Sequence, residues 1–281
     1  MPRKKTRWDF VAMKKAGDKI AFMTCYDYPT ALIAERAGLD MLLVGDSLGM
    51  CVYGYAGTVP VNMPEMLLHA AAVRRGAPET FVVGDMPFLS YQKDPYDAVE
   101  NAGQFLKAAG CDAVKLEGGR RVLPAVRAIV DAGMLVMGHI GLTPQSSGQQ
   151  GGFLAQGRTA ESARDLIDDA EALAGAGIFA LLLEAVPPEV GEIVAGRLPI
   201  PVLSIGAGAL CDGQLLIVSD LLGIFEAFTP KFVKKYAALA DEMGRAFRAY
   251  VDDVKAARFP EDRHTYKMVA GELEKLKGAL K

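Results

Sequence analysis

Several patterns that would narrow the class of protein are missing from this chain of 281 residues. The four cysteines are widely scattered and form no Cys-x-x-Cys pair, which argues against a zinc site and against a disulfide framework. Basic and acidic residues number 31 and 34, so no broad basic surface for nucleic acid is indicated. The most apolar runs are interrupted by acids or Gly and are too short for a membrane span. We therefore expect a soluble, cytoplasmic protein with no nucleic-acid or membrane partner.

Short runs rich in Val, Ile, Leu and Met alternate with longer stretches of helical period, the pattern of repeated βα units. Eight strands are predicted, at residues 19–25, 40–46, 80–85, 112–117, 134–140, 178–184, 201–206 and 215–219. Helices are predicted between them, at residues 29–37, 64–75, 95–109, 121–132 and 160–176. Apolar runs such as ALLLE suit strands that are buried on both faces. An α/β fold with an eight-stranded barrel is favoured, and a doubly wound open sheet is the alternative.

The length and the hydrophobic content of 51% suit one large domain, because α/β barrels commonly fill this length. We expect a single barrel domain over residues 1–281, with a basic N-terminal extension over about 1–15 and a helical C-terminal tail over about 261–281. The basic residues from Pro2 to Arg7 precede no apolar signal-peptide core, and we interpret them as a frayed, solvated terminus. A long helix is predicted from Pro230 to Lys255, whereas the eighth strand segment could equally be helical.

Four predicted strands end on a carboxylate, at Asp46, Asp85, Glu117 and Glu184. In a parallel barrel the carboxyl ends of the strands meet at one mouth, so these acids would face a common cavity. Crowded carboxylates resist ionising together unless a cation or an ammonium group offsets them. The repeated Val-Gly-Asp endings suit an oxygen-bound divalent cation such as Mg²⁺. The alternative for Asp46 is an ordinary turn or helix-cap residue.

Further polar residues lie near these strand ends. Lys115 is two positions from Glu117 on a predicted strand, so both side chains point into the barrel. Lys115 would neutralise acids or hold a substrate carboxylate, or else form a structural ion pair in the barrel floor. His139 would donate a hydrogen bond to a ligand, or else be a structural histidine. Ser47 follows Asp46 in a loop whose backbone N–H groups could approach an anion.

Glu184 follows an apolar run and precedes two prolines that stiffen the exit from the strand. A carboxylate that is partly removed from water at this place is suited to act as a general base. The alternative is a metal ligand or a salt-bridge partner. The sequence alone leaves both readings open.

The motifs occur in the order YDYPTA, LVGDSLGM, AAVRRGAP, GDMPF, VKLEGG, GHIGLTPQS, QGR, LLLEAVP and IGAG, followed by CDGQ. In this order they resemble the ketopantoate hydroxymethyltransferase (3-methyl-2-oxobutanoate hydroxymethyltransferase) family over roughly residues 15–260. The resemblance implies a (β/α)8 TIM barrel of the phosphoenolpyruvate/pyruvate type. It also implies an enzyme of pantothenate biosynthesis that transfers a one-carbon unit from 5,10-methylenetetrahydrofolate to 3-methyl-2-oxobutanoate, forming 2-dehydropantoate through a Mg-stabilised enolate. Mg²⁺ is the implied cofactor, and a homodecamer is the implied assembly.

The resemblance also implies roles for individual residues. Asp46 and Asp85 would bind Mg²⁺, with Glu117 beside the metal, either directly or through water. Glu184 would accept the substrate proton. The residues implied to contact the oxo acid are Asp46, Ser47, Asp85, Lys115 and His139.

Two other kinds of function stay open at this point. A Mg-dependent C–C lyase acting on a related 2-oxo acid would use the same enolate in reverse. Lyases of this superfamily usually carry a loop cysteine, for which Cys51 and Cys211 are poor matches by context. A non-catalytic binding protein would have little use for four strand-end acids together with Lys115.

Overall fold

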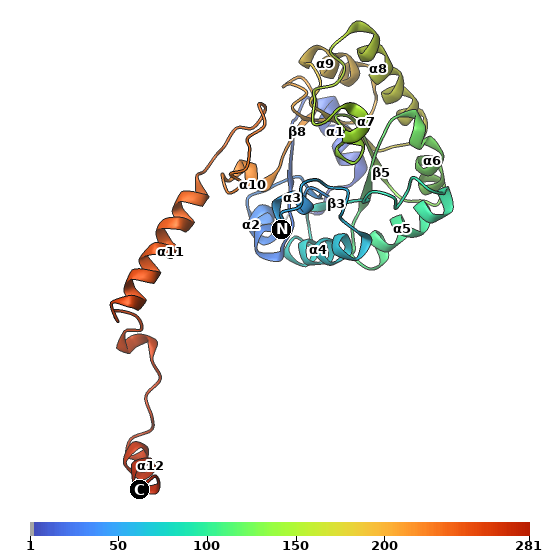
Figure 1. Cartoon of the computed structure of the whole chain (residues 1–281). Helices are drawn as coiled ribbons and strands as arrows, with labels where there is room; N and C mark the ends of the chain where they lie inside the picture. The colour runs from blue at the N-terminus through green and yellow to red at the C-terminus, as the bar shows by residue number, and fades with distance from the viewer. Residues whose placement is uncertain (1–2) are drawn as a thin grey trace. The chain divides into compact units, whose positions relative to one another are not determined.

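The computed structural model describes residues 3–281, and its core is a closed barrel of eight parallel strands (Figure 1). The strands pair in chain order, and the last strand returns to the first, with Gly213 opposite Ile20. The strands are β1 Ile20–Thr24, β2 Met41–Val44, β3 Phe81–Asp85, β4 Ala113–Glu117, β5 Val136–Gly141, β6 Ala180–Glu184, β7 Val202–Ile205 and β8 Gly213–Leu216. The predicted barrel is confirmed, and the open-sheet alternative is wrong.

Helices lie around the outside of the barrel (Figure 1). The longer ones are α2 Tyr28–Arg36, α4 Met63–Gly76, α5 Pro95–Lys107, α6 Leu123–Asp131, α8 Ala160–Gly175 and α9 Pro188–Arg197. Capping chemistry sets their starts: the side chains of Asn62 and Asp94 accept hydrogen bonds from first-turn N–H groups, and Pro occupies the first turn of both helices. The five predicted helices agree with the observed ones to within about two residues.

Short helical turns lie in the loops that follow β2, β4, β5 and β8. They are α3 Leu48–Cys51, the 3₁₀ turns η1 Arg120–Val122 and η2 Pro144–Ser146, α7 Ser147–Gln150 and α10 Val218–Leu221. The eighth strand was predicted over 215–219 but begins at Gly213, and the segment from Val218 is helical. A Cβ on Gly213 would lie 2.5 Å from the carbonyl oxygen of Ile20, so this position requires glycine. Because a glycine does not extend an apolar run, the start of this strand has no signal in the sequence.

Two apolar layers surround the strands, because alternate residues point to opposite faces. Phe81 and Val83 of β3 pack inside the barrel, whereas Val82 packs under the helices. Gly84 also faces the helices, and a Cβ there would lie 2.3 Å from the ring of Phe105. The Val-Gly-Asp sequence therefore lets α5 pack on the backbone of β3 while the next residue points into the barrel mouth.

The N-terminal segment forms a helix that closes the barrel at the amino ends of the strands. α1 Arg7–Ala16 starts in a capping box at Thr6, and its Phe10 is completely buried. The Phe10 ring packs edge-to-face on Phe81 at 5.2 Å between centroids, and Lys14 pairs with Asp212 at 2.6 Å. The prediction of a frayed, solvated terminus over Pro2 to Arg7 is wrong in part: Arg3 is exposed, but Lys4 and Lys5 pair with Asp112 and Asp40, and Thr6 caps α1. Pro2 lies outside the described residues.

The chain forms two compact units, one ending at Tyr236 and one spanning Ala237–Lys281. The second contains α11 Leu239–Lys255, the turn η3 Asp262–His264 and α12 Glu272–Ala279. The long helix predicted from Pro230 is wrong at its start. Residues 230–236 form turns and coil: Phe232 packs over Gly206, where a Cβ would lie 2.5 Å from the ring, and the N–H of Tyr236 donates to the carbonyl oxygen of Leu221. The expectation of one domain over the whole chain stays a prediction.

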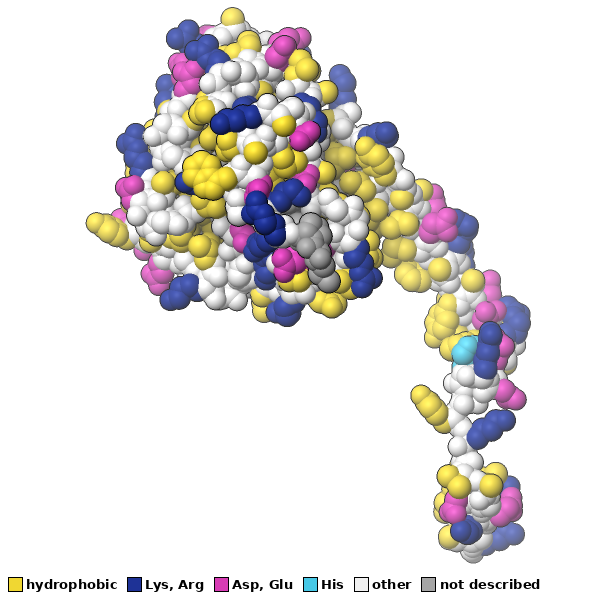
Figure 2. Space-filling model, turned by 180° about the vertical axis from the view of Figure 1, so that it is seen from behind, with side chains coloured by type: hydrophobic (Ala, Val, Ile, Leu, Met, Phe, Trp, Pro, Cys, Tyr) yellow, Lys and Arg dark blue, Asp and Glu magenta, His cyan; other side chains and the backbone are white. Residues whose placement is uncertain are grey.

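The surface mixes charges of both signs. On the face seen in Figure 2, Lys and Arg side chains lie scattered among acidic and apolar ones. No helix within residues 3–281 combines the length and the apolar content needed to cross a bilayer.

Candidate active site

The four strand-end acids line one pocket of about 780 Å³ at the carboxyl ends of the strands. Asp85, Glu117 and Glu184 are the last residues of β3, β4 and β6, and Asp46 follows β2 after Gly45. Lys115, His139 and Ser47 line the same pocket, and the Ser47 hydroxyl lies 2.8 Å from the Tyr26 hydroxyl. The structure thus brings every predicted site residue together, while the roles assigned to them stay predictions.

Asp46 and Asp85 are held side by side on neighbouring strands. The backbone N–H of Asp46 donates to Oδ2 of Asp85 at 3.0 Å. Both residues are almost inaccessible to solvent, at 4% and 1% exposure. The other oxygen of Asp85, Oδ1, lies 2.8 Å from Lys115 Nζ in an ion pair, but it accepts no hydrogen bond from residues 3–281. One carboxylate oxygen of Asp85 is therefore held by the backbone, and the other faces the ammonium group of Lys115.

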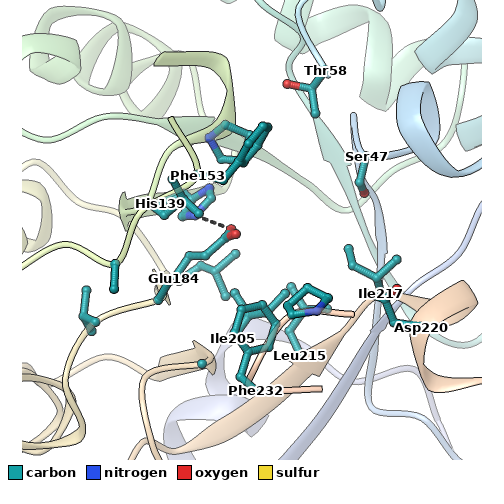
Figure 3. Close-up of a pocket in the computed structure, with 18 of the residues that line it drawn as sticks. Ser47, Thr58, His139, Phe153, Glu184, Ile205, Leu215, Ile217, Asp220 and Phe232 are labelled. Carbon is teal, nitrogen blue, oxygen red and sulfur yellow. Dashed lines mark ion pairs between the residues drawn. The ribbon is translucent and has the colours of Figure 1, made fainter. Parts of the chain in front are cut away.

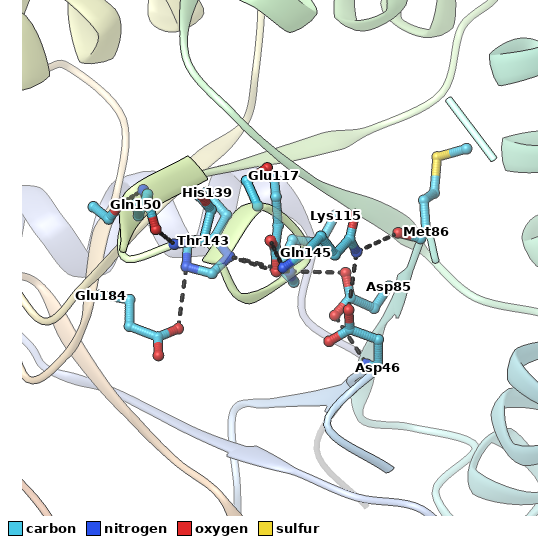
Figure 4. A network of polar contacts seen from close by, with 12 residues as sticks. Asp46, Asp85, Met86, Lys115, Glu117, His139, Thr143, Gln145, Gln150 and Glu184 are labelled. Carbon is cyan, nitrogen blue, oxygen red and sulfur yellow. Dashed lines mark hydrogen bonds and ion pairs between the residues drawn. The ribbon is translucent and has the colours of Figure 1, made fainter. Parts of the chain in front are cut away.

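Lys115 sits at the centre of the buried polar network (Figure 4). Its Nζ atom lies 2.8 Å from Asp85, 3.4 Å from Glu117 and 3.2 Å from His139 Nδ1. Strand register explains these contacts, since Lys115 is paired with Asp85 and Glu117 with His139. The network lies at the mouth, not in the barrel floor.

His139 bridges two carboxylates. Its Nδ1 lies 3.4 Å from Glu117 Oε1, and its Nε2 lies 3.2 Å from Glu184 Oε2. The Glu117 side chain is 1% exposed, whereas that of Glu184 is 15% exposed. Glu184 is thus the acid of this pair that a pocket ligand can reach.

The backbone around Glu184 is tightly constrained. Gly141 is its partner on β5, and a Cβ on Gly141 would lie 2.2 Å from the carbonyl oxygen of Glu184. Ala185 has a φ of +47°, in the left-handed region that alanine seldom occupies, and its N–H donates to Ile205 at 2.9 Å. This turn sets the direction in which the Glu184 side chain leaves the strand.

Two buried residues of the network, Gln145 and Tyr91, were not predicted from the sequence. Gln145 donates from Nε2 to Asp46 at 2.9 Å and from its backbone N–H to Glu117 at 3.0 Å. The hydroxyl of Tyr91 donates to Oε1 of Gln145 at 2.7 Å. Gln145 falls inside the quoted GHIGLTPQS motif, which was a usable signal, whereas Tyr91 lies in a loop without one.

Burial raises the pKa of Asp46 well above its usual value, and the charges of Asp85 and Glu117 raise it further. Burial also raises the pKa of Asp85, although Lys115 acts in the opposite direction. For Glu117, burial is outweighed by Lys115 and His139, which bring its pKa down to about 2. Asp46 is therefore the carboxylate whose charge this chain offsets least.

The acids of the network raise the pKa of both basic residues, Lys115 and His139. Burial alone would lower the pKa of Lys115, but Asp85, Glu117 and Asp46 raise it above its usual value. Burial and Lys115 likewise act to lower the pKa of His139, but its close contacts with the Glu117 and Glu184 carboxylates instead bring it to about 9. Both pKa shifts favour the charged forms of Lys115 and His139.

The Asp46 and Asp85 oxygens fit a divalent cation. Both are hard oxygen donors, both are buried, and Asp46 forms no ion pair within residues 3–281, although Lys115 lowers its pKa from a greater distance. Glu117 is already engaged by Lys115, so it suits a place beside such an ion better than a third direct ligand. Within residues 3–281, no three His, Cys, Asp or Glu side chains form a ready-made ligand set. Mg²⁺ commonly takes its other ligands from water or substrate.

The rest of the pocket is largely apolar (Figure 3). Ile205, Leu215 and Phe232 lie on one side of it, and Phe153 lies near His139. Apolar walls limit the access of water to the acids.

Sequence comparison places these observations in a family. The sequence profile described as ketopantoate hydroxymethyltransferase matches residues 4–262. The 3-methyl-2-oxobutanoate hydroxymethyltransferase of Alkaliphilus metalliredigens is 58% identical over 278 residues, which cover 98% of each chain. That of Desulfotalea psychrophila is 54% identical over 263 residues, covering 94% of each chain.

Solved structures share the fold at low identity. Phosphonopyruvate hydrolase in complex with oxalate and Mg²⁺ superposes with a TM-score of 0.60 at 13% identity, covering 98% of this chain and 95% of that one. The 2,3-dimethylmalate lyase of the PEP mutase/isocitrate lyase superfamily has a TM-score of 0.59 at 18% identity and covers 99% of both chains. The predicted barrel type is confirmed. By its sequence, this chain belongs to the ketopantoate hydroxymethyltransferase family.

Proposed function

We propose that this chain transfers a hydroxymethyl unit from 5,10-methylenetetrahydrofolate to 3-methyl-2-oxobutanoate, forming 2-dehydropantoate for pantothenate synthesis. The observation that carries the proposal is the meeting, in one pocket, of the buried Asp46–Asp85 pair with the partly exposed Glu184. Relatives that are 58% and 54% identical bear the name of this enzyme. This membership favours the transferase over the lyase and over the binding protein.

A Mg²⁺ ion held by Asp46 and Asp85 would polarise the carboxylate and ketone oxygens of a 2-oxo acid and so acidify its C3–H bond. Glu184 then accepts the C3 proton, and His139 orients Glu184 through their 3.2 Å contact. The carbon nucleophile forms a C–C bond to the methylene carbon of the folate and water forms a C–O bond to it, while both of its C–N bonds break. The two folate nitrogens take up the C3 proton and one proton of the water, which gives tetrahydrofolate and the hydroxymethyl group. Lys115 offsets Asp85 and Glu117, so that a substrate carboxylate can enter.

The assay combines the purified chain with 3-methyl-2-oxobutanoate, methylenetetrahydrofolate and Mg²⁺ and follows dehydropantoate by mass spectrometry. We expect product only when both folate and Mg²⁺ are present. Cleavage of a related 2-oxo acid without folate would support the lyase instead. Binding of the oxo acid without any turnover would support the binding protein.

We also infer that the chain forms a homo-oligomer in the cytoplasm, and family resemblance points to ten copies. None of the residues of α11 is buried, yet one face carries the exposed apolar side chains Met243, Phe247, Tyr250, Val251 and Val254. An amphipathic helix of this kind is stable when its apolar face is covered. Light scattering of the full chain should give a multiple of 30.0 kDa, and a monomeric mass would contradict this inference.

A further inference from the structure

The pocket extends well beyond the acids that the proposed proton transfer uses. One of its walls is formed by Thr58, Ile217 and Asp220. In Figure 3 this wall lies across the pocket from His139 and Glu184. A five-carbon oxo acid needs only part of a space of about 780 Å³, so the far wall is available to a second ligand.

Asp220 is a buried carboxylate with no partner. It is 6% exposed, and its side chain makes no hydrogen bond or ion pair with any other residue from 3 to 281. Burial raises its pKa, and Lys235 is the nearby cation that acts against this shift. Its carboxylate lines the pocket and is open to water there, so a ligand that displaces this water has to supply hydrogen-bond donors in its place.

Thr58 presents a second unpaired polar group on the same wall. It is 2% exposed, and its hydroxyl oxygen has no hydrogen-bond partner within residues 3–281. The carboxylate accepts hydrogen bonds only, whereas the hydroxyl can both donate and accept. This side of the pocket therefore offers a hydrogen-bond acceptor at Asp220 and a group of either kind at Thr58, with Ser47 between them in Figure 3.

Aromatic rings around the pocket suit a flat ligand. Phe225 and Phe228 pack edge-to-face at 5.4 Å between centroids, and both line the pocket. Phe153 and Phe228 are 52% and 50% exposed, an unusual exposure for rings in a cavity. Such rings gain from stacking on another aromatic system.

We infer that Asp220 anchors the pterin ring of the folate co-substrate, an inference that rests on the proposed function. The 2-amino group and N3–H of a pterin are two adjacent donors, and the two oxygens of a carboxylate accept from both. Thr58 lies farther along the same side of the pocket, where it can bond another polar group of the ligand. Arg158 and Lys231 also line the pocket but are exposed, where they suit the glutamate carboxylates of the folate tail.

Binding of tetrahydrofolate, measured by calorimetry with Mg²⁺ present, tests this assignment in the full-length protein. Asp220→Asn keeps the side-chain size but replaces one acceptor oxygen with a donor. We expect its Kd for tetrahydrofolate to rise at least about tenfold. Exchange of the C3 proton of 3-methyl-2-oxobutanoate in deuterated water should be unchanged, because Glu184 lies across the pocket. The matched control is Glu226→Gln, which removes an exposed charge outside the pocket lining and should leave both values unchanged.

A ligand analogue separates recognition from a structural role. The wild-type chain should bind 2-desamino-2-methyl-tetrahydrofolate at least about tenfold more weakly than tetrahydrofolate, and Asp220→Asn should remove most of this difference. Equal discrimination in both proteins, or no folate binding by the wild type, would overturn the inference. Loss of proton exchange in Asp220→Asn would indicate that this variant does not fold, and Thr58→Val then takes its place. Thr58→Val should weaken folate binding about threefold or more and leave proton exchange intact. Unchanged folate affinity in Thr58→Val would also overturn the inference. Folate discrimination without dehydropantoate formation would instead refute the proposed function alone.

Discussion

Lys115 and Asp85 are register partners on β4 and β3, and their Nζ and Oδ1 atoms lie 2.8 Å apart. Asp46, on the other side of Asp85, has no such cation within the part of the chain that the structure describes. The aspartates of the two Val-Gly-Asp sequences therefore differ in how their charges are balanced.

This difference predicts opposite effects of two substitutions. Without Mg²⁺, Asp46→Asn should keep or increase the free energy of unfolding, because it removes an unbalanced buried charge. Asp85→Asn should lower it by about 3 kcal/mol, because Lys115 loses a partner. Mg²⁺ at 100 times its Kd should stabilise only the wild type, by about 2.7 kcal/mol. Urea unfolding followed by circular dichroism measures the free energy of unfolding of the wild type and of both variants. An equal decrease of this free energy in the two variants without Mg²⁺ would contradict the charge argument.

Gln145 should be important for the geometry of the acids. Gln145→Ala removes the hydrogen bond to Asp46 and leaves the Tyr91 hydroxyl without its acceptor on Gln145. We therefore expect the free energy of unfolding to fall by about 2 kcal/mol and Mg²⁺ to bind more weakly. Gln149→Ala, an exposed residue of the same loop, is the control. Equal effects of the two substitutions would show that the network does not depend on Gln145.

The N-terminal helix should contribute strongly to stability. Phe10→Ala leaves a cavity against Phe81 at the closed end of the barrel, and we expect a cost of about 3–5 kcal/mol in unfolding free energy. Trp8→Ala on the same helix is the control, since Trp8 is 64% exposed. Denaturant titration of both variants checks this, and a Phe10→Ala protein as stable as the control would mean that the helix is not docked.

The cysteines should be inert in the folded protein. Burial raises the pKa of Cys25 and Cys111 to about 12 and that of Cys211 to about 11, and it also raises the pKa of Cys51. Since the thiolate is the reactive form, an aromatic disulfide reagent at about pH 8 should react slowly before unfolding and with all four thiols afterwards. Cys51, which is only partly buried and lines the pocket, should react first. Fast reaction at Cys25 or Cys111 would contradict the packing.

The sequence predicted the elements that carry strong local signals. Apolar runs located β1 to β7, and the shared mouth followed from parallel topology. Long-range packing decided the rest. β8 starts at Gly213, which the backbone of Ile20 approaches closely. Phe232 packs against Gly206 in a segment without a helix, and α11 starts at Leu239. Neither contact leaves a pattern in neighbouring residues.

The site divides in the same way. Acids at strand ends are visible in the sequence, because topology alone places Asp85 and Glu117 together. Tyr91 and Gln145 come from loops whose paths depend on tertiary contacts, and they join the network only in three dimensions. Asp220 shows no signal of its own, since one acid in the segment SDLL reads as a helix residue.

Proton exchange tests the central claim, that Glu184 removes a C3 proton made acidic beside the Asp46–Asp85 pair. The measurement follows loss of the C3 proton of 3-methyl-2-oxobutanoate in deuterated water by nuclear magnetic resonance, with Mg²⁺ and without folate. The wild type should exchange the proton, and Glu184→Gln should slow exchange by about 10²–10⁴-fold while still binding the oxo acid in a Mg²⁺-dependent manner. Exchange at the wild-type rate in Glu184→Gln would contradict the account.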